Sequence, residues 1–329
     1  MTKWKNGIAK ITLPTPFPVG DVNVFLVKGE RLTLVDAGTN NDESWNAFVK
    51  QLNDLHLTPN DIEQVIITHH HPDHVGLLAY FPESVDVFGH QLNQPWLTAT
   101  ESFIEDNEVF FERTIEEFGV PHEFLTLKHE FRRTTEYFCN RVLTGHLVEG
   151  DTAPGLSGWK VLETPGHASS HIGLLRESDG AFIGGDLLLP HISPNPILEP
   201  PLSREFSRPR PQLELNASLE KLTHYNIQTV FPGHGDEITE VEPLIEKRLN
   251  RQHERAMLVK KWLQNEEMTV FEVCQRLFPH VYERELILTL SETAAQIDYL
   301  LSLQEITMIN KEFPYRYRYK VKFPSVGGA

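Results

Sequence analysis

The sequence predicts an α+β fold, with a larger N-terminal part over residues 1–245 and a small C-terminal domain over residues 246–329. Three observations predict it. Short apolar strands alternate with helical segments along most of the N-terminal part, which is typical of a layered fold. A mostly helical stretch at about residues 96–140 interrupts this alternation and is interpreted as an insertion. After Pro243, helical segments are followed by two short strands.

The first elements are mainly strands. Residues 8–13 and 22–36 cluster β-branched and apolar side chains around a Lys28-Gly29-Glu30 turn, which predicts strands joined by a hairpin. Apolar side chains at helical spacing predict a helix over residues 42–55. We then expect a strand at 65–67, a helix at 75–80 and a strand at 85–88.

Strands return after the helical insertion. Apolar runs predict them at residues 159–162, 172–175, 181–183 and 229–231, with a helix over residues 211–224 before the last one. The proline-rich segment at 187–211 is too irregular for regular structure and long enough to be a functional loop.

The C-terminal residues predict three helices and a hairpin. The helices are expected at about 243–264, from a Thr269…Glu272 capping box onward, and at 291–303. Two strands at about 306–309 and 315–321 follow. Helices followed by a hairpin suggest a winged-helix-like domain.

The composition limits the substrate class, the cysteine chemistry and the cellular location that we expect. A formal net charge of −16 repels polyanions and argues against nucleic acid as the main substrate. Residues 246–329 are near neutral, with thirteen Lys or Arg against eleven Asp or Glu. Cys139 and Cys274 are far apart, which indicates neither a disulfide framework nor a thiolate metal site. With no apolar run of about 20 residues and no signal-peptide core, we expect a cytoplasmic protein without a membrane partner.

One short segment concentrates side chains that bind metals. His69-His70-His71-Pro72-Asp73-His74 directly follows an apolar strand. Imidazole and carboxylate groups suit zinc, iron or manganese, and a loop that leaves a strand lets several side chains converge on one point. The sequence therefore predicts a metal site here.

Three later motifs carry the same ligand types. Gly166-His167, Gly185-Asp186 and Gly233-His234 each follow an apolar strand, and each glycine permits a tight turn. Sites in layered folds commonly form at strand ends, so these residues are candidates for the same metal site.

In this order the motifs resemble the metallo-β-lactamase superfamily, whose pattern is His-x-His-x-Asp-His, then a His, an Asp and a final His. The resemblance covers about residues 8–240 and lies nearest the glyoxalase II-like branch. It implies an αββα sandwich with the site at one sheet edge, and two divalent cations, zinc by preference with manganese or iron as alternatives. Seven residues match the ligand positions: His69, His71 and His167 at one cation, Asp73, His74 and His234 at the other, and Asp186 bridging them.

Metal chemistry and position in the chain indicate roles for other residues. Two cations close together generate hydroxide from a bridging water near neutral pH, and Asp73 can both ligate and orient it. Asp36 is a candidate partner for the second nitrogen of a ligand histidine, although a turn-forming role is as plausible. His191, at the start of the proline-rich loop, is a candidate proton donor or substrate contact, with a solvated loop residue as the alternative. His70 is expected to point away from the metals.

Several activities fit this pattern. We expect hydrolysis of a small ester, thioester or lactone, in a pocket formed by residues 96–140 and 187–211. A winged-helix domain also occurs in a branch with an endoribonuclease, which keeps phosphodiester cleavage as an alternative. A mononuclear iron persulfide dioxygenase is a second alternative, and a non-enzymatic sensor that binds nucleic acid a third. A small molecule is the expected partner, and a homodimer stays open.

Overall fold

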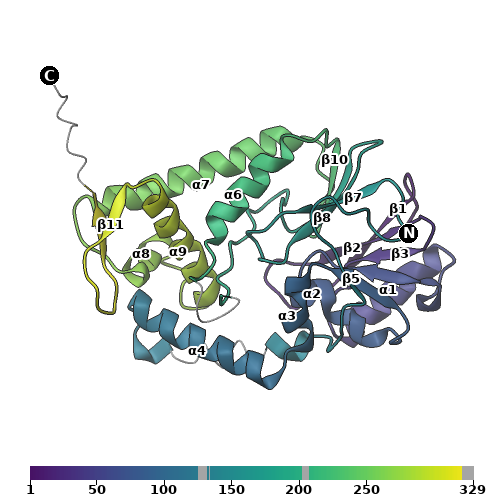
Figure 1. Ribbon diagram of the computed structural model, residues 1–329, viewed down its shortest axis with the longest axis horizontal. Helices are drawn as coiled ribbons and strands as arrows, with labels where there is room; N and C mark the ends of the chain where they lie inside the picture. Colours follow the sequence, from purple (N-terminus) through teal and green to yellow (C-terminus); the bar gives the residue numbers. More distant parts are fainter. Residues whose placement is uncertain (125–131, 133, 202–206, 321–329) are drawn as a thin grey trace.

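The computed structural model describes residues 1–124, 132, 134–201 and 207–320, and it contains two larger β-sheets (Figure 1). The first sheet has six strands in chain order, antiparallel from β1 to β3 and parallel from β3 to β6. Its strands are β1 (Ile8–Leu13), β2 (Val22–Val27), β3 (Thr33–Val35), β4 (Gln64–Ile66), β5 (Asp86–Gly89) and β6 (Gly145–His146).

The second sheet has four strands in the order β10-β9-β8-β7. Its strands are β7 (Trp159–Glu163), β8 (Ile172–Arg176), β9 (Ala181–Gly185) and β10 (Thr229–Pro232). Only β9 and β10 pair in parallel, because α6 (Pro211–Leu222) lies between them in the chain and provides the crossover that parallel pairing needs.

Three hydrophobic layers hold the two sheets between helices. In β2, Val24 packs on the side of helix α1 (Asp42–Asp54), whereas Phe25 packs between the sheets, because successive strand side chains point to opposite faces. A third layer lies under α6 and α7 (Val241–Leu263), on the outer face of the second sheet. Both faces of both sheets are thus covered, which confirms the αββα sandwich.

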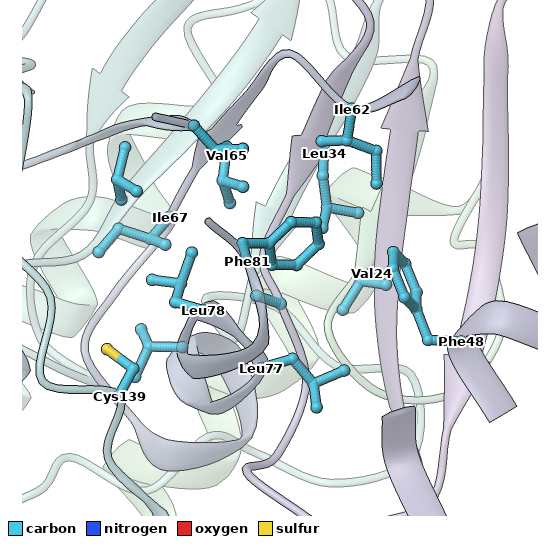
Figure 2. Close-up of a cluster of buried hydrophobic side chains, with 14 of the residues drawn as sticks. Val24, Leu34, Phe48, Ile62, Val65, Ile67, Leu77, Leu78, Phe81 and Cys139 are labelled. Carbon is cyan, nitrogen blue, oxygen red and sulfur yellow. The ribbon is translucent and has the colours of Figure 1, made fainter. Parts of the chain in front are cut away.

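Phe48 is one of the side chains through which α1 packs against the first sheet, and it is 1% exposed (Figure 2). We expect Phe48→Ala to lower the free energy of unfolding by about 3–5 kcal/mol, because the substitution removes apolar contacts and leaves a cavity. Denaturant unfolding of metal-stripped protein measures this loss. Val109→Ala, at an exposed position of helix α4 (Glu101–Phe118), is the control and should stay within about 0.5 kcal/mol of wild type. A loss below about 1 kcal/mol for Phe48→Ala would contradict this layer assignment.

The helical insertion and the C-terminal residues share a fourth hydrophobic core. Ile115 and Phe118 of α4 (Glu101–Phe118) pack into the same cluster as Phe271 and Leu290. The C-terminal elements are α8 (Val270–Leu277), α9 (Leu286–Ser302) and the antiparallel pair β11 (Ile306–Met308) and β12 (Tyr317–Tyr319). In Figure 1, α4 runs beside this group of helices, at the end of the molecule away from β1 and β3.

The structure differs from the predicted elements at four places. The helix expected at 75–80 is a short α2 (Pro72–Val75) continued by a 3-10 helix (Gly76–Tyr80). Strand β6 was missed, since two residues carry no periodic signal. Within the insertion, α3 (Gln94–Thr98) and α4 are separate helices, and the second helical segment falls partly on residues 125–131 and 133, outside the described residues. Helix α9 begins five residues before its predicted start, because Leu286 and Leu290 are buried in the fourth core.

Helix α7 runs across the expected boundary at residues 245/246. Ile245 packs under the second sheet, whereas Ala256 and Val259 pack in the fourth core, so one helix serves both parts. The capping box at Thr269 is confirmed, as are the buried, free thiols of Cys139 and Cys274. The winged-helix assignment stays a prediction. None of the helices described here is both long and apolar enough to cross a membrane.

Candidate metal centre

Strand ends bring the candidate ligands together. The segment from Thr68 to His74 leaves β4, and Pro72 begins helix α2, so that Asp73 and His74 lie in its first turn. His167 follows β7, Asp186 follows β9 and His234 follows β10. Because β9 and β10 are parallel neighbours, their carboxyl ends lie at the same edge of the sheet.

The ligand atoms form two groups joined by one carboxylate. His69, His71 and His167 offer nitrogens within 4.8 Å of one another, and Asp73, His74 and His234 form a second such group. Asp186 lies between the groups: Oδ1 is 3.5 Å from His74 Nε2, and Oδ2 is 3.5 Å from His167 Nε2 and 3.4 Å from His234 Nε2. The structure therefore brings together all seven residues that the sequence pattern predicts.

Several of these ligand atoms are buried without a hydrogen-bond partner in the described part of the chain. They are Nε2 of His74, His167 and His234, and Oδ1 of Asp186. A buried polar atom left unpaired costs free energy, and most such atoms in proteins find a partner. Divalent cations bound by imidazole nitrogen and carboxylate oxygen would satisfy all four. The donor set thus fits two metal ions.

In three of the candidate histidines, the second ring nitrogen is held by a hydrogen bond. His74 Nδ1 donates to Asp36 Oδ2 at 2.8 Å, which confirms the predicted role of Asp36. His167 Nδ1 donates to the Asn195 carbonyl and His234 Nδ1 to the Asp21 carbonyl, each at 2.8 Å. These bonds place the proton on Nδ1 and leave Nε2 as the metal-binding atom.

The electrostatics differ between the two groups. Burial, with the neighbouring imidazoles, holds the pKa of His69 and His71 well below the usual value, so both stay neutral and able to ligate. Burial opposes protonation of His234 as well, yet the carboxylates of Asp186 and Asp73 outweigh it and raise its pKa to about 10. The same balance, led by Asp186 after burial, raises the pKa of His74. The carboxylate-rich half therefore attracts a cation strongly.

His171 is a site residue that sequence reasoning missed. Its Nε2 accepts the backbone N–H of Asp186 at 3.1 Å, and its Nδ1 lies 2.8 Å from Thr164 Oγ1. Because Nε2 accepts, the ring proton must lie on Nδ1 and donate to Thr164. The only signal was a second histidine four residues after His167 in the same turn.

Two glycines allow the close approach of these groups. A side chain on Gly233 would collide with the Asp186 carboxylate and with His74. A side chain on Gly166, whose φ is +133°, would collide with the backbone of Leu215 in α6. Glycine is required at both turns for space, and at Gly166 for its backbone conformation as well.

Of the two other histidines of interest, only His191 lies apart from the ligand groups, because the His70 ring is 5.0 Å from that of His71, lines the cavity and forms a further possible ligand group with His71 and Glu199. His191 is exposed and is not among the described residues that line the cavity over the metal centre, so its role as proton donor stays a prediction without structural support. His70 stacks on Trp96 with ring centroids 4.1 Å apart, and its Nδ1 lies 2.9 Å from Ser170 Oγ. His70 Nε2 is 3.7 Å from the buried carboxylate of Glu199.

A cavity of about 600 Å³ opens directly above Asp73, His167 and Asp186. Its walls include Trp96, Phe111 and Phe138 from the insertion region and eight residues of the proline-rich loop between Leu189 and Glu199, as the sequence predicted. The sequence did not predict a further wall, formed by residues 284–288 at the start of α9.

The chain belongs to the metallo-β-lactamase superfamily, because the model described as "Metallo-beta-lactamase superfamily" matches residues 17–234. That span includes all seven candidate ligands. It ends before α7, so the family match says nothing about the C-terminal helices.

Particular relatives extend the likeness along the whole chain. "Probable metallo-hydrolase YqjP" of Bacillus subtilis is 45% identical over 300 residues, which is 91% of this chain and 94% of the relative. A metallo-beta-lactamase family protein of Thermus thermophilus superposes with a TM-score of 0.80 at 26% identity, covering 96% of this chain and 99% of the other. A beta-lactamase domain protein of Burkholderia ambifaria gives 0.78 at 21% identity, over 97% and 93% of the two chains, which supports the fold alone.

Proposed function

We propose that this protein is a metal-dependent hydrolase with a dinuclear, zinc-type centre that acts on a small ester, thioester or lactone. The observation that carries the proposal is a largely apolar cavity that opens on the ligand groups. The name metallo-hydrolase given to the Bacillus subtilis relative supports the reaction class.

The lining of the cavity favours an apolar acyl group over a polyanion. Aromatic and aliphatic side chains form most of it, among them Trp96, Phe111 and Leu286. Of its described lining residues, only Arg284 is a lysine or arginine, and the whole chain carries a net charge of −16. Nucleic-acid binding draws most of its affinity from several cationic contacts with phosphates, which this lining lacks.

The residues at the floor of the cavity supply the chemistry. Two divalent cations, when bound, lower the pKa of water and polarise a substrate carbonyl. Asp73 lines the cavity, and its Oδ2 lies 3.3 Å from His234 Nε2, so its carboxylate can orient the attacking nucleophile. The apolar walls exclude bulk water and hold the acyl chain over this point.

A substrate panel tests the proposal. We expect zinc-loaded enzyme to cleave p-nitrophenyl esters, an acyl thioester or a lactone at least about 100-fold faster than bis-p-nitrophenyl phosphate or single-stranded RNA, since the site is built for one acyl chemistry. Ile197→Trp, which fills part of the cavity, should raise KM for long-chain esters by about tenfold and leave short-chain esters unchanged. Val142→Trp, at an exposed position outside the cavity lining, is the control.

Two other results would replace the proposal. Faster cleavage of RNA than of any ester would indicate a phosphodiesterase or endoribonuclease. A single bound iron with oxygen uptake on glutathione persulfide would indicate the dioxygenase. If Ile197→Trp and Val142→Trp changed KM for long-chain esters equally, the cavity would not be the substrate-binding site.

A further inference from the structure

We propose that helix α9 positions the metal ligand His167 through Asn195, so that the C-terminal helices are part of the metal centre. Asn195 lies in the proline-rich loop, between the turn that carries His167 and the start of α9. This inference concerns the metal centre alone and does not depend on the substrate class.

Asn195 makes one hydrogen bond to each side. Its backbone carbonyl accepts the Nδ1 proton of His167 at 2.8 Å, which sets the rotation of that imidazole. Its side-chain Nδ2 donates to the carbonyl of Leu288 in α9 at 2.9 Å. The side-chain amide thus holds the loop backbone at the place where the carbonyl meets the metal ligand.

The loop is fastened to α9 at two further points. The backbone N–H of Leu198 donates to Ser291 Oγ at 3.2 Å. Arg208 forms a bidentate ion pair with Asp298, with N–O distances of 2.6 and 2.8 Å, and the Asp298 side chain is only 6% exposed. A bidentate arginine pair defines geometry more strictly than a single contact. The loop is therefore bonded to one helix at three separate points.

The loop also holds the backbone of the ligand turn. Glu199 accepts the backbone N–H of Ser169, two residues after His167, at 3.1 and 3.3 Å from its two oxygens. On the opposite side, Ser218 of α6 donates to the Pro165 carbonyl at 2.7 Å. Helix α6 thus supports the turn itself, whereas the ring of His167 is oriented from the α9 side.

The test measures metal affinity and the visible spectrum of the Co²⁺-loaded full-length protein. Asn195→Leu keeps the size of the side chain but removes the donor to Leu288. We expect about tenfold weaker binding of one of the two Co²⁺ ions in chelator competition, with a shifted absorption band, because partners of metal-bound histidines typically contribute about 10–100-fold to affinity. Asp298→Asn should give a smaller change in the same direction.

The control is Gln51→Leu, which removes side-chain hydrogen bonds to Thr12 between α1 and β1, neither of which lines the cavity over the candidate metal centre. It should lower the melting temperature and leave Co²⁺ affinity and spectrum at wild-type values. Wild-type affinity and spectrum in both Asn195→Leu and Asp298→Asn would overturn the proposal. If Asn195→Leu does not fold, Ser291→Ala replaces it, and an unchanged spectrum in Ser291→Ala and Asp298→Asn would equally overturn it.

Discussion

Asp186→Ala is expected to reduce bound metal from about two ions per chain to about one or fewer, with kcat/KM at least about 1,000-fold lower. The reason is geometric. The Asp186 carboxylate lies within 3.5 Å of one imidazole from the first ligand group and two from the second. Elemental analysis of freshly purified protein, paired with the ester assay, measures both effects.

Asp236→Ala is the matched control for this variant. It removes the same charge from the loop after β10, but its side chain is 89% exposed and forms an ion pair with Lys10 at 3.8 Å. Metal content and activity should stay at wild-type values. Retention of two ions by Asp186→Ala would show that the two groups bind metal independently.

Metal affinity is expected to fall steeply as the pH falls. Asp186 and Asp73 raise the pKa of His234 to about 10, and a metal bound at its Nε2 must displace that proton. Below pH 10 each unit of acidification then costs about tenfold in affinity for each proton displaced, or roughly 1,000-fold between pH 9.5 and 6.5. Calorimetry in buffers of different ionisation enthalpy should detect the release of at least one proton per chain.

Metal-stripped protein should show the opposite trend in stability. A histidine whose folded-state pKa is raised stabilises the fold fully below its unfolded value near 6.5, and that stabilisation is lost as the pH rises toward 10. The melting temperature of stripped protein should therefore fall between pH 6.5 and 10, and His234→Ala should flatten this fall.

A metal affinity independent of pH would contradict the assignment of His234 as a ligand.

The sequence alone was sufficient to predict the layered fold and to pick out the seven candidate metal ligands that the fold brings together. The ligands stand in contiguous motifs directly after apolar strands, and the glycines beside His167 and His234 mark tight turns. Such local patterns can be seen in the chain because strand periodicity and turn chemistry depend on near neighbours. Asp36 was predicted for the same reason, since it ends a strand in a turn.

Only the tertiary structure decided which groups hydrogen-bond to these candidate ligands and which segments form the cavity above them. His234 donates to Asp21, 213 residues away in the chain, and His167 donates to Asn195 in an irregular loop. Residues 284–288 form a cavity wall although nothing in their sequence marks a site, and His191 is exposed although its position in the chain suggested the pocket. These features depend on which distant segments meet in space. No local sequence pattern predicts these contacts, because every residue type has a backbone carbonyl and many types can pack in a cavity wall.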